Sequence, residues 1–283
     1  MDLSRISSSV DVNALLQKHV TIVGLGACKV AEGLAKCGVG SFSLIDFDTV
    51  SPSNIARQDF NFTDIARRKV EAVAERLVRI NPEVEVETYA LNYCALSVEE
   101  HDRLFGHTDL FVFATDSFIA QARGNREATR LRKPALFIGL YRGGRAAEIV
   151  YWFHGVTPAC YRCICSIRYE AFARGQGNIS SEGGTIFDLG LLHSIAGQIG
   201  LGILTHGADN RYGRLLQQLG NRNLLQTKID PKYALAGKDI FGKYLGNHPA
   251  NFSFTTIALP MERDPNCPDC SSLYKQPVEN LYG

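Results

Sequence analysis

Residues 20–29, VTIVGLGACK, place a short apolar run directly before a turn that contains two glycines. An apolar run that ends at Gly24 is typical of a buried parallel strand. Ala31 and Leu34 then recur at helical spacing until Gly38, which predicts a helix after the turn. Strand, glycine turn and helix in this order indicate the first unit of an α/β sheet.

The same alternation of strands and helices continues along the chain. Apolar or alternating runs predict further strands at 42–45, 84–89, 110–113, 135–140, 148–153 and 252–259. Helical spacing from Ala66 to Ile80 and an aliphatic stretch from Leu189 to Leu204 predict two more helices. Residues 206–251 are polar, and we interpret them as a partly helical insertion. The pattern predicts an α/β fold with a doubly wound, Rossmann-like parallel sheet.

The overall composition is that of an ordinary globular protein. The chain has 283 residues, of which 45% are hydrophobic and 21% charged, so disorder over its whole length is excluded. A net charge of +1 indicates no nucleic-acid partner. No segment is expected to span a bilayer, and the start MDLSR lacks the layout of a signal peptide. We therefore predict a cytoplasmic protein without membrane contact.

Two features near the first two strands suggest a nucleotide site. Gly24 and Gly26 let the backbone approach a phosphate at a helix N-terminus, although the usual dinucleotide fingerprint has a glycine where Lys29 stands. Asp46 and Asp48 follow the second strand, where an acidic residue can accept hydrogen bonds from ribose hydroxyls. Alone, each feature could be a tight turn or a helix cap; together they favour a nucleotide.

The charged residues that follow distinguish ATP from NAD. Arg57 and Lys69 could neutralise a triphosphate, and Asp116, at the end of a later strand, could hold Mg²⁺. Each of the two cations alone is more often a solvated surface charge. A dehydrogenase needs no such pair of cations with a carboxylate, so the combination favours Mg-ATP.

Two CxxC pairs indicate a metal site. Cys160, Cys163, Cys267 and Cys270 supply four thiolates, the set that a structural Zn²⁺ prefers. Because the two pairs lie far apart in the sequence, the metal would clip the end of the chain onto its body. The alternative is a thioredoxin-like redox pair, but neither pair is expected at the start of a helix in a suitable βαβ unit.

As a set, these motifs resemble the ubiquitin-activating-enzyme-like superfamily, and within it the ThiF/MoeB-type adenylyltransferases. The resemblance rests on the glycine turn, LIDFDTV at 44–50, SNIARQ at 53–58, Lys69, ATD at 114–116 and the paired CxxC. It implies a single ThiF/MoeB-like domain over 1–283. The nucleotide-binding half would be 20–155, and the zinc-braced half would be 156–283, with the polar insertion at 206–251.

The resemblance also implies a reaction and a set of site residues. The C-terminal glycine carboxylate of a ubiquitin-like protein would attack the α-phosphate of ATP, giving an acyl-adenylate and pyrophosphate. The implied nucleotide-binding residues are Gly24, Gly26, Asp46, Asp48, Asn54, Arg57, Gln58 and Lys69. The implied catalytic residues are Arg57, Lys69 and Asp116, with Mg²⁺ on Asp116 and Zn²⁺ on the four cysteines. Family members usually form homodimers in which a partner arginine completes the site; Arg5 is the one arginine before the first strand here.

One departure from the family pattern affects the expected mechanism. Many relatives carry a reactive cysteine in the loop before the long helix, whereas residues 174–188 contain none, and Ser180 or Ser181 stands in its place. We therefore predict that no thioester forms on this loop. Three alternatives stay open: a non-catalytic scaffold that binds a ubiquitin-like protein or a partner subunit, an NAD(P)-dependent dehydrogenase, and adenylation of a peptide or a tRNA base.

Overall fold

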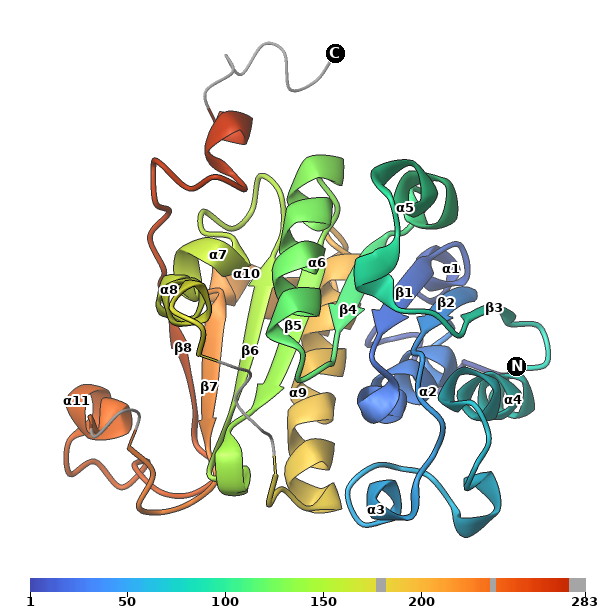
Figure 1. Ribbon diagram of the computed structural model, residues 1–283, viewed down its shortest axis with the longest axis horizontal. Helices are drawn as coiled ribbons and strands as arrows, with labels where there is room; N and C mark the ends of the chain where they lie inside the picture. The colour runs from blue at the N-terminus through green and yellow to red at the C-terminus, as the bar shows by residue number, and fades with distance from the viewer. Residues whose placement is uncertain (177–181, 235–237, 275–283) are drawn as a thin grey trace.

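The computed structural model describes residues 1–176, 182–234 and 238–274. Its centre is one eight-stranded sheet in the order β3-β2-β1-β4-β5-β6-β7-β8 (Figure 1). The strands are β1 (His19–Val23), β2 (Ser41–Ile45), β3 (Glu85–Tyr89), β4 (Leu110–Phe113), β5 (Ala135–Leu140), β6 (Ala146–Trp152), β7 (Leu224–Lys228) and β8 (Thr256–Leu259). The seven strands predicted from the sequence are all present, and β7 is an addition.

The sheet has a parallel part and an antiparallel part. Neighbouring strands from β3 through β2, β1 and β4 to β5 are parallel, as predicted for a doubly wound fold. From β5 onward the neighbouring strands are antiparallel, whereas the sequence pattern predicted a parallel sheet. For β5 and β6 the cause is the short turn between them, where Gly143 and Gly144 adopt φ of +76° and +66°. Such a short connection can join only antiparallel strands.

Helices cover both faces of the sheet (Figure 1). They are α1 (Val12–Leu16), α2 (Cys28–Lys36), α3 (Pro52–Ile55), α4 (Lys69–Ile80), α5 (Val98–Phe105), α6 (Phe118–Leu131), α7 (Tyr161–Ile164), α8 (Ser166–Ala173), α9 (Ile186–Leu204), α10 (Arg211–Leu219) and α11 (Ile240–Leu245). One apolar core lies between the sheet and α2, α4, α9 and α10. A second core lies on the other face, beneath α5, α6 and α7.

Two helices differ from the sequence expectations. The helix predicted from Ala66 begins instead at Lys69, because Ala66 has a left-handed φ of +68° and its N–H bonds the Val50 carbonyl at 2.9 Å. The predicted aliphatic helix is α9, and by length and composition it could cross a membrane, contrary to the expectation that no segment could. Its C-terminal half is buried, and the helix packs against β5 and α2.

Strand β7 lies inside the segment interpreted as a polar insertion. All five of its residues are buried, although Gln226, Thr227 and Lys228 are polar. Each polar side chain has a partner: Gln226 donates to the Tyr141 hydroxyl at 3.2 Å, and Lys228 donates to Asn251 at 3.0 Å. Because polar side chains can be buried when they are paired, a hydrophobicity pattern does not detect a buried strand of this kind. The insertion is therefore partly helical, as expected, but it also extends the sheet.

Candidate functional site

A cavity of about 460 Å³ opens at the carboxyl ends of the parallel strands. The loops after β1, β2 and β4 line it, together with the end of β5. The strand order reverses between β1 and β4, and open α/β sheets bind ligands at this kind of position. A volume in this range suits a nucleotide-sized ligand. Of the predicted site residues, eight line the cavity: Gly24, Gly26, Asp46, Asp48, Arg57, Gln58, Lys69 and Asp116.

The turn after β1 requires glycine at its first position. Gly24 has a φ of +87°, and a Cβ added there would lie 2.7 Å from the Ala114 carbonyl oxygen. A left-handed φ and this close approach both exclude larger residues. The turn leads through a short 3₁₀ segment into α2, and Gly26 and Ala27, just before the N-terminus of α2, line the cavity. Lys29, which replaces the fingerprint glycine, lies outside the cavity and pairs with Asp59 at 3.8 Å.

The loop after β2 joins two aspartates to a buried lysine. The side chain of Lys69 is only 7% exposed, and its Nζ lies 3.0 Å from Asp48 Oδ2 and 4.0 Å from Asp46 Oδ2. Each carboxylate oxygen of Asp46 accepts a backbone N–H, from Leu25 at 2.8 Å and from Asp48 at 2.9 Å. Burial raises the pKa of Asp46, and Lys69 opposes that rise. The ammonium and the two carboxylates therefore form one electrostatic unit at the cavity wall.

The remaining predicted residues lie at different places around the cavity. Arg57 lines it beside Gln58, whose Oε1 is buried and has no hydrogen-bond partner within the described part of the chain. Asp116 is exposed at the end of β4. Asn54 does not line the cavity: its Oδ1 accepts the Ser51 N–H at 2.8 Å at the start of α3. An unpartnered buried acceptor, a glycine cradle and a buried cation are features that a bound polar ligand would satisfy.

A polar wall on the other side of the cavity was not predicted from the sequence. Arg168 on α8 bonds Glu148 on β6 at 2.5 Å, and the Tyr141 hydroxyl donates to the other Glu148 oxygen at 2.5 Å. Glu148 is nearly buried, and burial together with this carboxylate raises the pKa of Tyr141 well above its usual range. The one signal in the sequence is a glutamate within an otherwise apolar strand.

Hydrogen bonds connect this wall to the loop that carries Asp116. The Tyr161 hydroxyl accepts from Arg168 at 3.1 Å and donates to Gln121 Oε1 at 2.5 Å. The amide of Gln121 in turn donates to the Thr115 carbonyl at 3.0 Å. Tyr161 lies between two of the clustered cysteines, so the cysteine cluster and the Asp116 loop are ends of one continuous network.

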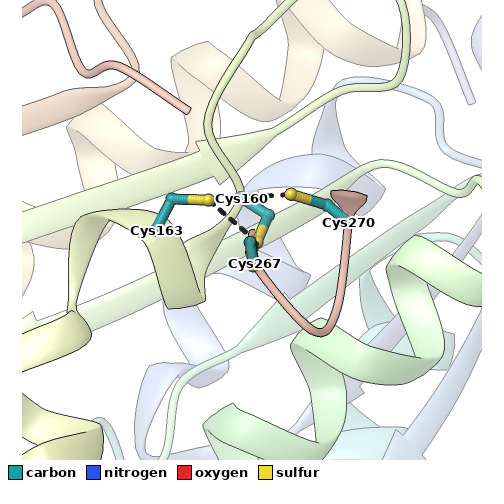
Figure 2. Close-up of side chains that lie close together, drawn as sticks. All are labelled: Cys160, Cys163, Cys267 and Cys270. Carbon is teal, nitrogen blue, oxygen red and sulfur yellow. Dashed lines mark hydrogen bonds between the residues drawn. The ribbon is translucent and has the colours of Figure 1, made fainter. Parts of the chain in front are cut away.

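The four predicted cysteines converge, although Cys267 and Cys270 come from the far end of the chain (Figure 2). Their sulfurs are separated by 3.8 Å (Cys160–Cys163), 3.7 Å (Cys160–Cys267) and 3.6 Å (Cys163–Cys270). Zn–S bonds of ~2.3 Å in a tetrahedron place neighbouring sulfurs ~3.8 Å apart, so the cluster is compatible with zinc. Cys160 precedes the short helix α7, but α7 lies between the antiparallel strands β6 and β7 rather than in a βαβ unit, and four convergent thiols fit a metal set better than a redox pair.

Side chains around the cluster hold it on the fold. Asn125 on α6 donates to Asp269 at 2.7 Å and accepts the Tyr161 N–H at 2.9 Å. Arg162 pairs with the other oxygen of Asp269 at 3.3 Å. These bonds connect α6, α7 and the C-terminal segment, as expected for a clip that closes a long loop.

The model of the ThiF family matches residues 1–208, so the chain belongs to the ThiF family. It is 31% identical over 154 residues to the molybdopterin-synthase adenylyltransferase of Escherichia coli, covering 53% of this chain and 60% of that protein. It is 27% identical over 174 residues to the ubiquitin-like modifier-activating enzyme 5 of Caenorhabditis briggsae, covering 58% of this chain and 40% of that protein. The chain thus spans between about two fifths and three fifths of the length of these relatives.

Solved structures share the fold over a larger part of the chain. The crystal structure of E. coli MccB with ATP superposes with a TM-score of 0.67 and covers 92% of this chain and 68% of that chain. The sequence identity is 18%, so the likeness concerns the fold. The Rossmann-like α/β fold predicted from the sequence is therefore confirmed, and so is the resemblance to ThiF/MoeB-type proteins.

Proposed function

We propose that this chain binds Mg-ATP in the cavity and adenylates the C-terminal glycine carboxylate of a ubiquitin-like protein, releasing pyrophosphate. One observation carries the proposal: the glycine turn, the buried ammonium of Lys69 and the carboxylate of Asp116 line a single cavity at the reversal of the strand order. The names of the sequence relatives, an adenylyltransferase and a ubiquitin-like modifier-activating enzyme, support the reaction class and the substrate class.

The proposed roles follow from the positions of the side chains. Gly24 and Gly26 give the phosphates access to backbone N–H groups, and Asp46 with Asp48 binds the ribose. Arg57, Lys69 and the amide of Gln58 bind phosphate oxygens, whereas Asn54, outside the cavity, caps the start of α3. Arg57 and Lys69 stabilise the charge that builds on the departing pyrophosphate, an effect that is strong in a water-poor site.

We propose that the chain binds two metal ions, Mg²⁺ at the cavity and Zn²⁺ at the cysteine cluster. Asp116 offers an exposed carboxylate at the cavity rim for Mg²⁺, which neutralises phosphate charge when bound. Cys160, Cys163, Cys267 and Cys270 bind one structural Zn²⁺ with no open position. The zinc fixes the Tyr161–Gln121–Thr115 connection and thereby the position of the Asp116 loop.

We also propose that two copies of the chain associate and that the protein acts in the cytoplasm. The N-terminal half of α9 supports the homodimer, because Phe187 is 85% exposed and Leu191 and Ile195 are only partly buried. A second copy would cover this apolar face. Light scattering of the purified protein at micromolar concentration would measure the mass, and a monomer at all concentrations would refute the dimer.

The proposed reaction is tested by ATP–pyrophosphate exchange. Gly-terminated ubiquitin-like proteins are compared with the same proteins carrying a C-terminal amide, and with short peptides that end in a free carboxylate. Exchange with a Gly-terminated protein and none with its amide would support the proposal. Exchange with the short peptides alone would assign a peptide substrate instead.

The matched variant for this assay is Asp116→Asn. Its side chain is exposed at the end of β4, so the substitution removes the charge without disturbing the core. Preorganised charges of this kind contribute on the order of 10² to 10³ in rate, and we expect a loss of this size. Binding of a ubiquitin-like protein without any exchange would support the non-catalytic scaffold.

A further inference from the structure

A polar patch lies on β1, β2 and β3, on the α5 side of the sheet and away from the nucleotide cavity. His19 begins β1, whereas the cavity lies beyond the other end of that strand. His19 is 8% exposed, while Glu87 on β3 and His107 after α5 are exposed. One ring nitrogen of each histidine and a carboxylate oxygen of Glu87 all lie within 4.8 Å of one another. The proposed adenylation uses none of these three side chains.

The backbone fixes the two histidines relative to each other. The His19 N–H donates to Asp109 Oδ2 at 2.9 Å, and the Asp109 N–H donates to the His19 carbonyl at 2.9 Å. Thr108 and Thr21 share a hydrogen bond of 2.5 Å between their hydroxyls. These bonds hold the loop before β4 against β1, and the two imidazole rings meet edge to face at 4.2 Å between centroids.

Serine hydroxyls contact both ring nitrogens of His19. Ser41 Oγ lies 2.9 Å from Nδ1 and donates to the Lys18 carbonyl at 3.3 Å, so it can accept an Nδ1–H. Nε2 lies 2.9 Å from Ser43 Oγ, and Ser43 Oγ donates to Glu87 Oε2 at 3.0 Å, which places Nε2 on the Glu87 side. Zinc on Nε2 would take the place of the Ser43 contact, with the ring proton on Nδ1 held by Ser41. A histidine whose second N–H is held by a neighbour is the usual form of a metal ligand.

We propose that His19, Glu87 and His107 form a second zinc site, separate from the four cysteines, with its remaining position open to solvent. Two imidazoles and one carboxylate are a ligand set that binds Zn²⁺ and leaves a fourth position for water.

Zinc binding requires the three ligand side chains to move only slightly toward one another. Zinc bonds of 2.0–2.1 Å in a tetrahedron separate the ligand atoms by ~3.4 Å, so the three groups move together by at most ~1.4 Å. Glu87 and His107 are exposed, and rotation of their side chains supplies this movement while His19 stays fixed. The metal would tie the edge strand β3 to β1 and to the loop before β4, which stabilises an otherwise exposed sheet edge.

The test is zinc stoichiometry on protein whose four-cysteine site is already filled. Zn²⁺ is titrated calorimetrically, and the bound metal is counted by elemental analysis after gel filtration. We expect a second equivalent of zinc per chain. His107→Ala and Glu87→Gln should remove it, whereas His206→Ala and Glu85→Gln, exposed controls outside the cluster, should retain it. Ser41→Ala should weaken the second site by about tenfold or more, as loss of a supporting hydrogen bond does.

A second readout covers the case in which a variant folds poorly. In the wild-type protein, saturating Zn²⁺ should slow amide exchange on β3, and this protection should be absent in His107→Ala. One zinc per chain in the wild type, or a second equivalent that persists in both His107→Ala and Glu87→Gln, would overturn the proposal. Pyrophosphate exchange is independent of this result, because the cluster lies away from the cavity.

Discussion

Replacing Lys69 with methionine separates the structural role of this lysine from its role in phosphate binding. The Nζ–Oδ2 distance of 4.0 Å to Asp46 corresponds to ~4 kcal/mol at an effective dielectric constant of ~20. The cost of burying the ammonium offsets part of this, and Asp48 is half exposed, so we expect a net loss of ~2 kcal/mol. For 283 residues the unfolding entropy is ~0.6 kcal/mol per degree, which converts this loss to a fall in Tm of ~3 °C.

The sign of the pH dependence follows from Asp46. Burial raises the pKa of Asp46, so its ionised carboxylate destabilises the folded state at pH values above that raised pKa. This destabilisation disappears as the pH falls toward the ordinary pKa of an aspartate. Without Lys69 the cost is larger. The Tm difference between wild type and Lys69→Met should therefore be greatest near pH 7 and should shrink on acidification, as measured by calorimetry across this range.

The double variant Asp46→Asn with Lys69→Met tests whether Lys69 only balances the charge of Asp46. Removing the buried charge should recover most of the lost Tm, while pyrophosphate exchange should stay at least 10²-fold below wild type, because the phosphate-binding cation and a ribose-binding carboxylate are both absent. Recovery of exchange together with stability would show that Lys69 only balances Asp46. A Tm that is unchanged in Lys69→Met would refute the electrostatic argument itself.

Three further predictions concern the cysteine cluster, the Tyr161 hydroxyl and the expected absence of a thioester. Chelation of the cysteine-bound zinc, or Cys267→Ser, should lower Tm by more than about 5 °C, measured with metal content, because structural zinc contributes folding energy; metal-free protein of equal Tm would contradict it. Tyr161→Phe removes the hydroxyl that donates to Gln121 Oε1 and accepts from Arg168, and should cost about 1–3 kcal/mol in urea unfolding, whereas Tyr151→Phe, whose buried hydroxyl has no partner within the described residues, should cost almost nothing. With Mg-ATP and the true acyl substrate, a non-reducing gel should show no thiol-sensitive adduct; an adduct lost in Cys165→Ala would move the chemistry to that buried thiol, whose pKa burial raises to about 12.

The nucleotide side of the cavity could be predicted from the sequence because its residues follow strands in order. Gly24 and Asp46 stand directly after parallel strands and Asp116 stands three residues after one, and parallel strands bring such positions to one edge. The four cysteines could also be predicted as a metal site from the sequence, since paired CxxC motifs indicate a ligand set whatever their separation. Ser180 and Ser181, which stand where relatives carry a cysteine, lie outside the described residues.

The opposite wall could not be predicted in this way. Glu148 and Arg168 come from a strand and a helix whose pairing depends on how α8 packs, which no sequence spacing encodes. The same holds for β7, whose polar side chains Gln226 and Lys228 bond partners far along the chain. His19 and His107 meet only because the loop before β4 bonds the start of β1. In each case a tertiary contact, rather than a local pattern, creates the feature.

Transfer of label from ATP distinguishes adenylation of the carboxylate from other uses of the nucleotide. The purified protein is incubated with Mg²⁺, a Gly-terminated ubiquitin-like protein and ATP labelled in either the α- or the γ-phosphate, and the products are separated under mildly acidic conditions. We expect the α-label, and not the γ-label, to become bound to the ubiquitin-like protein, and we expect Asp116→Asn to abolish this transfer. Label from the γ-phosphate on the protein, or cleavage of ATP without any acyl-linked α-label, would contradict carboxylate adenylation in this cavity.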